Sequence, residues 1–265
     1  SILLVVLSAA AAAWLPALGY VFTIIGAAVC GLLYTRRGWY PVTVSAVLGF
    51  AATFAVARSP LTAFLLTVGI VLPGCAMMVC WKKGLGMKEI VVAGTIGLLV
   101  QTLLEFGIVQ LQTGKNLFSE AIAGIQAEVD GMLPQFQQIM EEAGTANVEE
   151  CMQALSELTL SFVELTAQLI PAILFIFCCI AAYLILSICR VVLRREGNNV
   201  KKILPFTEIY APRTVVLAVV VTFVISLLVS QQVIRGAAVN ITVVLFCYFI
   251  VCGISLLCFF MKYWF

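Results

Sequence analysis

The sequence predicts an all-α, polytopic transmembrane helical bundle of about eight spans, with an extracytoplasmic amphipathic helical hairpin between spans five and six. Hydrophobic residues make up 63% of the 265 residues and charged residues only 11%, whereas soluble domains have roughly 45–50% and about 25%. The apolar residues fall in runs long enough to cross a bilayer. Most charges lie in the short segments between these runs, and the acids are concentrated in one insert.

The first uncharged stretch, residues 2–35, is too long for a single span of about 20 residues. Pro16 and Gly19 lie near its middle, and a proline removes a backbone donor and breaks a helix. We therefore expect two rather short helices, at residues 2–15 and 20–34. A single long first helix is the alternative, and it would give seven spans and place the N-terminus outside.

The remaining apolar runs predict six further spans, at residues 41–57, 61–81, 89–111, 169–193, 214–233 and 239–263. The chain then divides into three parts. Residues 1–111 hold spans one to five, residues 112–164 form the insert, and residues 165–265 hold spans six to eight.

The positions of Lys and Arg predict the orientation, because cytoplasmic loops retain positive charge. The eight-span arrangement leaves only Arg58, Lys115 and Arg235 outside. The inner side holds the other twelve basic residues: Arg36, Arg37, Lys82, Lys83, Lys88, Arg190, Arg194, Arg195, Lys201, Lys202, Arg213 and Lys262. We therefore expect both termini in the cytoplasm. These inner basic clusters could also bind anionic lipid head groups.

The insert at residues 112–164 is acidic, with nine Asp and Glu residues against Lys115, which gives a local charge of −8. Its apolar residues recur in steps of three and four, which is typical of packed amphipathic helices: Phe118, Ile122, Ile125, Val129, Met132, Phe136 and Ile139, then Cys151, Leu155, Leu158, Phe162, Leu165 and Leu169. We expect Pro134 to kink or restart the first helix, and Asn147 with Glu150 to cap the second. The pattern predicts a hairpin that continues spans five and six. It either packs on itself, attracts cations or covers a ligand mouth.

Glu105 is the only acid well inside a predicted span. A charge at membrane depth costs several kcal/mol and is by default a functional-site hypothesis. Gln101 lies one turn away on the same face. Alternatively Glu105, about 9 Å from the outer end of its span, reaches the interface or bonds a neighbouring helix. Arg58, at the outer tip between spans three and four, could pair with Glu105 or an anionic ligand, or be an exposed loop residue. Glu105, Gln101 and Arg58 are thus the candidate ligand-binding residues.

Two further polar or small-residue patterns concern packing. Small residues recur at every fourth position of the third span, at Ser45, Gly49, Thr53 and Ala57, and predict a close approach to another helix of this chain or of a partner. Asn240 and residues 231–232 flank the last expected outer loop, so we expect them at the membrane interface.

The sequence offers no pattern for catalysis. Histidine is absent, and the ten cysteines show no zinc or disulfide spacing. No nucleotide loop, nucleophile elbow or basic nucleic-acid surface is present. We therefore expect no catalytic residue, metal, cofactor or nucleic-acid partner, and a protein that is not an enzyme.

Several short runs resemble a known family. They are RVVLRREG at 190–197, LPFTE at 204–208, Pro212-Arg213, LIPA at 169–172 and CGIS at 252–255. Together with the order of the spans they resemble the YybS-like family of predicted bacterial membrane proteins, a domain of unknown function. The family has a Trp-Arg-Leu-type run where this chain has Ile-Tyr-Ala at 209–211, so a contact made there in relatives is not carried over.

The resemblance implies a multi-pass protein of the bacterial plasma membrane. The family is distantly similar to the substrate-binding subunits of energy-coupling-factor transporters. That similarity implies an outward-opening pocket for a small solute, and ATPase and coupling membrane subunits as partners. A basic inner segment at 190–213, with Arg194, Arg195 and Arg213, would be their docking surface.

Three functional hypotheses follow. The first is a small-solute-binding transporter subunit that uses Glu105, Gln101 and Arg58. The alternative is a membrane scaffold or regulator of envelope or signalling proteins, in which Glu105 is structural. The third is a proton- or cation-coupled transporter with Glu105 as its ion site. The substitution Glu105→Gln separates the second hypothesis from the other two.

Overall fold

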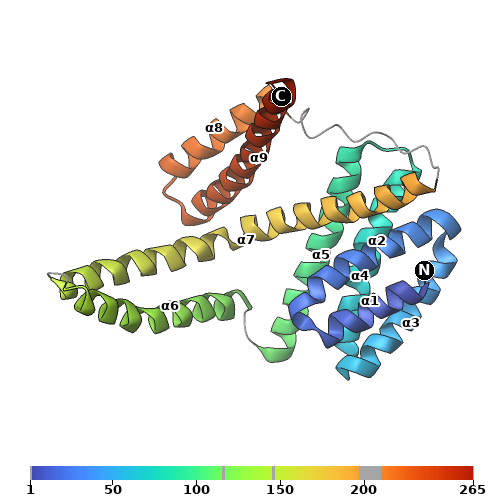
Figure 1. The fold of residues 1–265 in the computed structure, drawn as a ribbon, viewed down its shortest axis with the longest axis horizontal. Helices are drawn as coiled ribbons and strands as arrows, with labels where there is room; N and C mark the ends of the chain where they lie inside the picture. The colour runs from blue at the N-terminus through green and yellow to red at the C-terminus, as the bar shows by residue number, and fades with distance from the viewer. Residues whose placement is uncertain (1, 115–116, 145–146, 197–209, 265) are drawn as a thin grey trace. The chain divides into compact units, whose positions relative to one another are not determined.

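The computed structural model describes residues 2–114, 117–144, 147–196 and 210–264. Within these ranges the chain forms α-helices, one 3-10 helix and no strand (Figure 1). The elements are α1 (Ile2–Trp14), η1 (Pro16–Leu18), α2 (Gly19–Arg37), α3 (Trp39–Ala57), α4 (Pro60–Lys82), α5 (Met87–Thr113), α6 (Leu117–Glu142), α7 (Val148–Arg195), α8 (Arg213–Leu228) and α9 (Gln232–Trp264). The predicted all-α fold is confirmed. Lys115, Lys201, Lys202 and the run at 204–208 lie outside the described residues.

Six of the described helices are long and apolar enough to cross a membrane: α2, α3, α4, α5, α7 and α9. Two shorter apolar helices, α1 and α8, occupy the first and seventh predicted spans. α8 has 16 residues, which is about 24 Å of helix and less than the roughly 30 Å of a bilayer core. The polytopic helical bundle is therefore confirmed, with two of its eight apolar helices shorter than a full span.

The chain breaks at Pro16, as predicted. α1 ends at Trp14, and α2 begins at Gly19 after the 3-10 turn. The two helices run antiparallel, because a Cβ on Gly26 would lie 3.1 Å from Ser8 and one on Gly19 would lie 3.4 Å from Ala12. The alternative of one long first helix is wrong, since the proline ends the first helix and the chain turns back.

The chain divides into two compact units, which are described separately. Unit 1 comprises Ser1–Glu105, Leu174–Tyr210 and Val251–Phe265, and unit 2 comprises Phe106–Ile173 and Ala211–Ile250. Unit 1 therefore holds α1 to α4, most of α5 and the second half of α7. Unit 2 holds α6, the first half of α7, α8 and much of α9.

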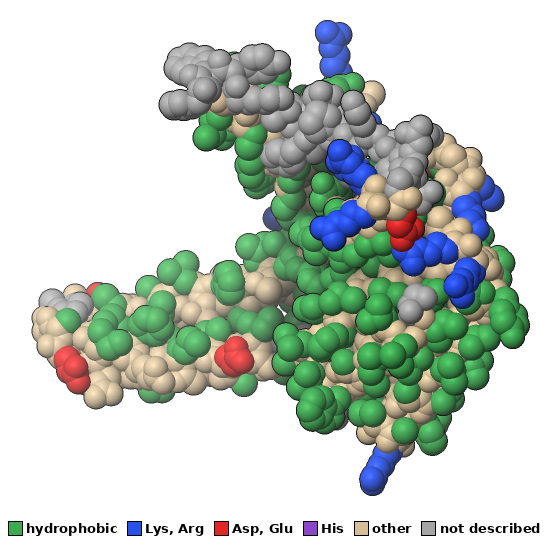
Figure 2. All heavy atoms as spheres, turned by 45° about the vertical axis from the view of Figure 1, so that its right-hand side comes forward, with side chains coloured by type: hydrophobic (Ala, Val, Ile, Leu, Met, Phe, Trp, Pro, Cys, Tyr) green, Lys and Arg blue, Asp and Glu red, His purple; other side chains and the backbone are tan. Residues whose placement is uncertain are grey.

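Unit 1 is organised around α2, which packs against α1, α3 and α4. One buried cluster joins α2, α4, α5 and α7, with Ala28, Met77, Leu98 and Ile185 among its members. A second cluster joins α1, α2, α3 and α4. The outer faces of these helices remain apolar (Figure 2), which suits a bundle whose solvent is lipid.

Helices α2 and α4 approach each other at glycines. A Cβ on Gly31 would lie 2.8 Å from Met78 and 2.9 Å from the Gly74 carbonyl oxygen. A Cβ on Gly74 would lie 3.0 Å from the Ala27 carbonyl carbon and closer still to its oxygen. Neither residue could carry a side chain without separating the helices, so this pair sets their spacing.

The small-residue stripe on α3 packs inside the chain. Ser45 and Thr53 are fully buried, and a Cβ on Gly49 would lie 3.7 Å from the Ala9 Cβ. Helices α1 and α3 contact each other extensively. The stripe therefore packs against α1 and is not exposed to a partner helix.

The insert forms α6 and the first half of α7, with residues 143–147 between them (Figure 1). α6 continues through Pro134 without restarting. α7 begins directly after Asn147, whose carbonyl accepts from Cys151 and whose amide donates to Glu150 at 3.2 Å. α7 is one helix of 48 residues, about 72 Å at 1.5 Å per residue. The predicted continuation of the sixth span is confirmed, whereas α5 ends at Thr113, before a Gly114 with φ +66°.

The predicted apolar seam of the insert is wrong for most of α7. Leu158 and Phe162 are 69% and 60% exposed, and Cys151 and Leu165 are also exposed. The covered positions instead are Met152, Leu155, Thr159, Val163 and Thr166. In α6, Ile122, Ile125 and Val129 are half-buried as predicted, but Met132, Phe136 and Ile139 are exposed. Both helices carry apolar residues on more than one face, so the spacing alone could not select the packed one.

The seventh span ends earlier than predicted. α8 stops at Leu228 and α9 starts at Gln232. The apolar runs predicted that the seventh span ends at residue 233 and that the eighth starts at residue 239. The connection lies at the polar residues Ser230 and Gln231, and Val233 and Ile234 begin the next helix. Asn240 is therefore two turns inside α9, and its predicted place beside a loop is wrong.

Candidate functional site

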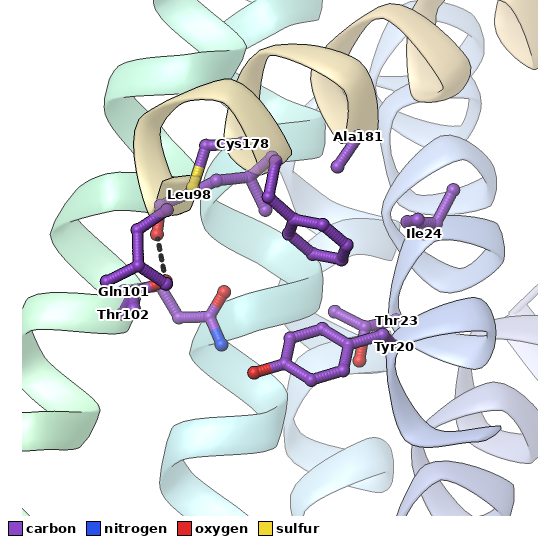
Figure 3. A pocket seen from close by; sticks show the side chains of 10 residues that line it. Tyr20, Thr23, Ile24, Leu98, Gln101, Thr102, Cys178 and Ala181 are labelled. Atoms are coloured by element: carbon purple, nitrogen blue, oxygen red, sulfur yellow. Dashed lines mark hydrogen bonds between the residues drawn. The ribbon is translucent and has the colours of Figure 1, made fainter. Parts of the chain in front are cut away.

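A small, mostly apolar recess with a few polar side chains lies inside unit 1 between α2, α5 and α7 (Figure 3). Its volume is about 30 Å³, close to the share of one water molecule in the liquid. Its lining comes from three helices: Tyr20, Thr23 and Ile24 of α2, Leu98, Gln101 and Thr102 of α5, and Leu174, Phe177, Cys178 and Ala181 of α7. Polar groups are few among these residues, so each one matters.

Gln101 and Thr23 are the buried polar residues of the recess, with 8% and 7% of their surfaces exposed. The Gln101 amide points toward the Tyr20 ring (Figure 3). Gly69 of α4 makes room for it, because a Cβ there would lie 2.7 Å from both Cδ and Nε2 of Gln101. Within the described part of the chain no hydrogen bond to this amide is found. Its polar atoms are not among the fully buried, unpartnered side-chain atoms of the described residues, which are Thr53 Oγ1 and Arg190 Nε. The amide is therefore accessible from the recess, where a ligand or a water molecule can form hydrogen bonds with it.

The hydroxyl groups of Thr23 and Thr102, beside Gln101, both donate hydrogen bonds within their own helices. Thr23 donates to the Gly19 carbonyl at 2.9 Å, and Thr102 donates to the Leu98 carbonyl at 2.9 Å. Each keeps lone pairs for a donor in the recess. Tyr20 packs edge-on against Phe177, with ring centroids 5.5 Å apart, and is 61% exposed. The recess therefore opens past Tyr20.

Glu105 lies one turn beyond Gln101 on the same face of α5 and is half-buried. It is near enough to the Tyr20 hydroxyl to interact with it electrostatically. Of the two sequence-predicted residues, Gln101 lines the recess, whereas Glu105 is not among the lining residues and lies one helical turn beyond it. Their role as ligand-binding residues stays a prediction.

Arg58 is not brought to this recess. It is exposed and caps the C-terminus of α3 in a left-handed conformation, with φ 53°. In the ranges that the structure describes, no ion pair or hydrogen bond joins it to Glu105. The position fits the exposed loop arginine that the sequence left open.

Several basic residues of unit 1 gather where α2, α4 and α7 end, away from the recess. Arg36 forms an ion pair with Glu196, and Lys82 donates to the Tyr34 carbonyl at 3.0 Å. Figure 2 shows several Lys and Arg side chains over this end of the bundle. The ends of α2, α4 and α7 therefore meet there.

The predicted docking residues are placed only in part. Arg194 and Arg195 are exposed in the last turn of α7, in unit 1. Arg213 is exposed at the start of α8, in unit 2. The segment at 197–209 that would join them lies outside the described residues.

One comparison bears on identity. A family model described as "Predicted membrane protein (DUF2232)" matches residues 2–265. The chain belongs to this family. Membership of DUF2232 confirms the resemblance to a family of predicted membrane proteins, and the likeness to energy-coupling-factor subunits stays a prediction. No curated protein and no solved structure matches the chain.

Sequence reasoning predicted that Asn240 of this DUF2232 protein lies beside a loop, and it missed the contact of this residue with α7. Its amide oxygen accepts from the Ala172 backbone N–H at 2.9 Å, and its amide nitrogen donates to the Gln168 carbonyl at 2.8 Å. These two backbone groups would otherwise pair with each other in α7, next to Pro171. Asn240 therefore bridges the helix at its proline, as neighbouring helices do for proline-disrupted spans. An Asn inside one apolar run and a proline inside another were the available signals.

We expect Gln101→Leu to leave this DUF2232 protein folded and to raise its free energy of unfolding by about 1 kcal/mol. The substitution replaces a largely buried amide that has no hydrogen-bond partner among the described residues, and it keeps the volume similar. Thermal unfolding of the purified protein, with Thr102→Val as the neighbouring control, measures the change. A loss of stability in Gln101→Leu would show that the amide is bonded in the folded protein and would contradict a site waiting for a ligand.

Proposed function

We propose that this membrane protein is the small-solute-binding subunit of a transporter, of the energy-coupling-factor substrate-binding type. The observation that carries the proposal is the amide of Gln101, which faces the recess and has no hydrogen-bond partner among the described residues. A bound solute would supply the missing hydrogen bonds.

The chemistry of the recess favours a neutral or cationic group of the solute. The threonine lone pairs accept hydrogen bonds, and the Gln101 amide both donates and accepts. Glu105, one turn beyond Gln101 on α5, is a further acceptor outside the lining. No Lys or Arg is among the lining residues. An amide, hydroxyl or ammonium group therefore fits better than a carboxylate or phosphate. With about 30 Å³, the recess accepts one such group, and the rest of the solute would extend past Tyr20.

The position of the recess supports uptake from outside. Tyr20 and Arg36 lie 16 residues apart on α2, about 24 Å along the helix. The recess is thus near the end of the bundle opposite the basic cluster. Under the predicted orientation, in which basic residues face the cytoplasm, this end faces outward.

A subunit of this type needs other proteins to drive transport. The sequence has no nucleotide-binding loop, so ATPase and coupling membrane subunits would supply the energy. Arg194, Arg195 and Arg213 are the proposed docking residues for them. On this proposal the protein is not an enzyme and carries no cofactor.

The test is native mass spectrometry of the full chain, extracted gently from its host membrane. We expect a retained small molecule or co-purifying ATPase and coupling subunits. Glu105→Gln should lower solute retention about tenfold or more, because a hydrogen bond to a charged group contributes about 1.5–3 kcal/mol. Glu128→Gln, an exposed acid of α6, serves as the matched control.

Two results would oppose the proposal. One is an empty protein that retains only envelope or signalling proteins. The other is solute retention that is equal in Glu105→Gln and in the unaltered chain.

A membrane scaffold or regulator is the second candidate function. Exposed apolar side chains on the insert favour it: Met132, Phe136, Ile139, Leu158, Phe162 and Leu165. Large exposed apolar patches often mark protein interaction sites. In this case Glu105→Gln would leave partner binding intact, whereas Phe136→Ser with Phe162→Ser would weaken it.

A further inference from the structure

A second hollow of unit 1 lies on the lipid-facing side of the bundle and is independent of the recess. It is a groove of about 480 Å³ over α4, between the start of α3 and α5. All of its lining residues are apolar: Trp39, Val71, Leu72, Cys75, Ala76, Val79, Cys80, Ala93 and Ile96. None of them takes part in the proposed solute site.

The groove has a floor of small residues and walls of large ones. Cys75, Ala76 and Ala93 are covered, whereas Trp39 and Ile96 are 56% and 55% exposed. From Val71 to Cys80 the groove follows α4 for nine residues, about 14 Å. That length is close to half of a bilayer core of about 30 Å. The groove therefore spans roughly one leaflet.

One end of the groove leads to a cationic and aromatic rim. The Trp39 ring packs on Tyr34, with centroids 4.7 Å apart. The Lys82 ammonium lies 4.4 Å from the centroid of Tyr34 and bonds its carbonyl. Lys82 and the exposed Lys83 follow the groove residue Val79 by three and four positions, so they lie on the same side of α4. Two positive charges thus stand where the apolar groove meets the membrane surface.

We propose that this groove binds an anionic phospholipid, with one acyl chain along the floor and the phosphate at Lys82 and Lys83. The apolar lining excludes a polar occupant, and the rim supplies the complementary charge. Trp39 stands at the level of the head groups, where tryptophan is enriched in membrane proteins. The Lys82 ammonium donates one of its three hydrogen bonds to the Tyr34 carbonyl, which leaves two N–H groups for phosphate oxygens.

The dimensions favour an acyl chain over a helix. The groove lies between the side chains of neighbouring helices, which pack about 8–10 Å apart. A helix with its side chains is about 10–12 Å across and is wider than such a groove. A neighbouring span could therefore cover the groove but could not fill it.

The experiment places the full chain in vesicles of phosphatidylcholine with a minority of phosphatidylglycerol. Native mass spectrometry after mild detergent extraction then counts the retained lipids. We expect preferential retention of phosphatidylglycerol, lowered about fivefold by Lys82→Gln or Lys83→Gln, since each lysine near the surface contributes about that factor. Arg235→Gln, a basic residue of α9 outside the groove, should leave retention unchanged.

A second pair of variants tests the groove itself. Ala76→Phe fills the floor and should abolish retention of both lipids, whereas Ala51→Phe, on the exposed face of α3, should not. Ile96→Ala opens the wall at an exposed position, so it tests the groove even if Ala76→Phe fails to fold. Equal retention of the two phospholipids in the unaltered chain would overturn the proposal. So would lipid retention that survives Ala76→Phe and Ile96→Ala, or a dimer that dissociates in these variants.

Discussion

Gly74→Ala is expected to lower the free energy of unfolding by about 3 kcal/mol, at the upper end of overpacking costs. The new Cβ would lie 3.0 Å from the Ala27 carbonyl carbon, closer to its oxygen, and 3.2 Å from the Gly31 nitrogen. All three are backbone atoms, which cannot rotate away as a side chain can. Helices α2 and α4 would have to separate, and the Met77 and Met78 packing beside them would loosen.

The matched control is Gly107→Ala in α5, where a Cβ would meet nothing within 4 Å. There alanine should be neutral or stabilising by up to about 1 kcal/mol, because glycine is the poorer helix former. Tryptophan fluorescence during a detergent-denaturant titration measures both. Similar effects at the two positions would show that helix propensity, and not the α2–α4 contact, governs the result.

Asn240→Leu is expected to lower the free energy of unfolding by about 2–3 kcal/mol. The substitution leaves the Ala172 N–H and the Gln168 carbonyl without the amide that bridges them, and unpaired backbone groups in an apolar medium are costly. Asn240 also bonds the Gly236 carbonyl of its own helix at 2.9 Å. That bond adds little, because the carbonyl can accept from the backbone of α9.

A double-mutant cycle with Pro171→Ala isolates the cause. Alanine at 171 would let α7 complete its own hydrogen bonds, so Asn240→Leu should cost less than half as much in that background. Thr242→Val, two positions along α9, is the comparison. It removes a 3.0 Å bond to Thr222 and should cost only about 0.6 kcal/mol. Full additivity of Pro171→Ala and Asn240→Leu would contradict the bridging role.

One lining residue of the recess, Gln101, and its neighbour Glu105 could be predicted from the sequence. Glu105 and Gln101 stood out because polar residues are rare in a chain of this hydrophobicity, and a spacing of four placed them on one helix face. Their partners in the recess could not be predicted. Tyr20 and Phe177 are ordinary residues of apolar runs, and only the packing of α2 against α7 brings their rings together.

Arg58 shows the opposite case. Its charge at the outer end of two spans suggested a partner for Glu105, but the structure leaves it exposed at a helix terminus. Charge marks a residue as costly to bury, and it does not say whether the fold buries it. Asn240 was predicted beside a loop for a different reason, because its distance from the loop depended on where α8 ended.

The sequence by itself determined the membrane class, the number of apolar helices and the break at Pro16, because hydrophobicity, length and a missing backbone donor are local properties. It did not determine which faces pack. In lipid, both sides of a helix are apolar, so a hydrophobic pattern no longer separates inside from outside. The close backbone approach at Gly74 and the hydrogen bonds of Asn240 determine which helix faces pack together. Both depend on residues far apart in the chain, so only the tertiary structure decided them.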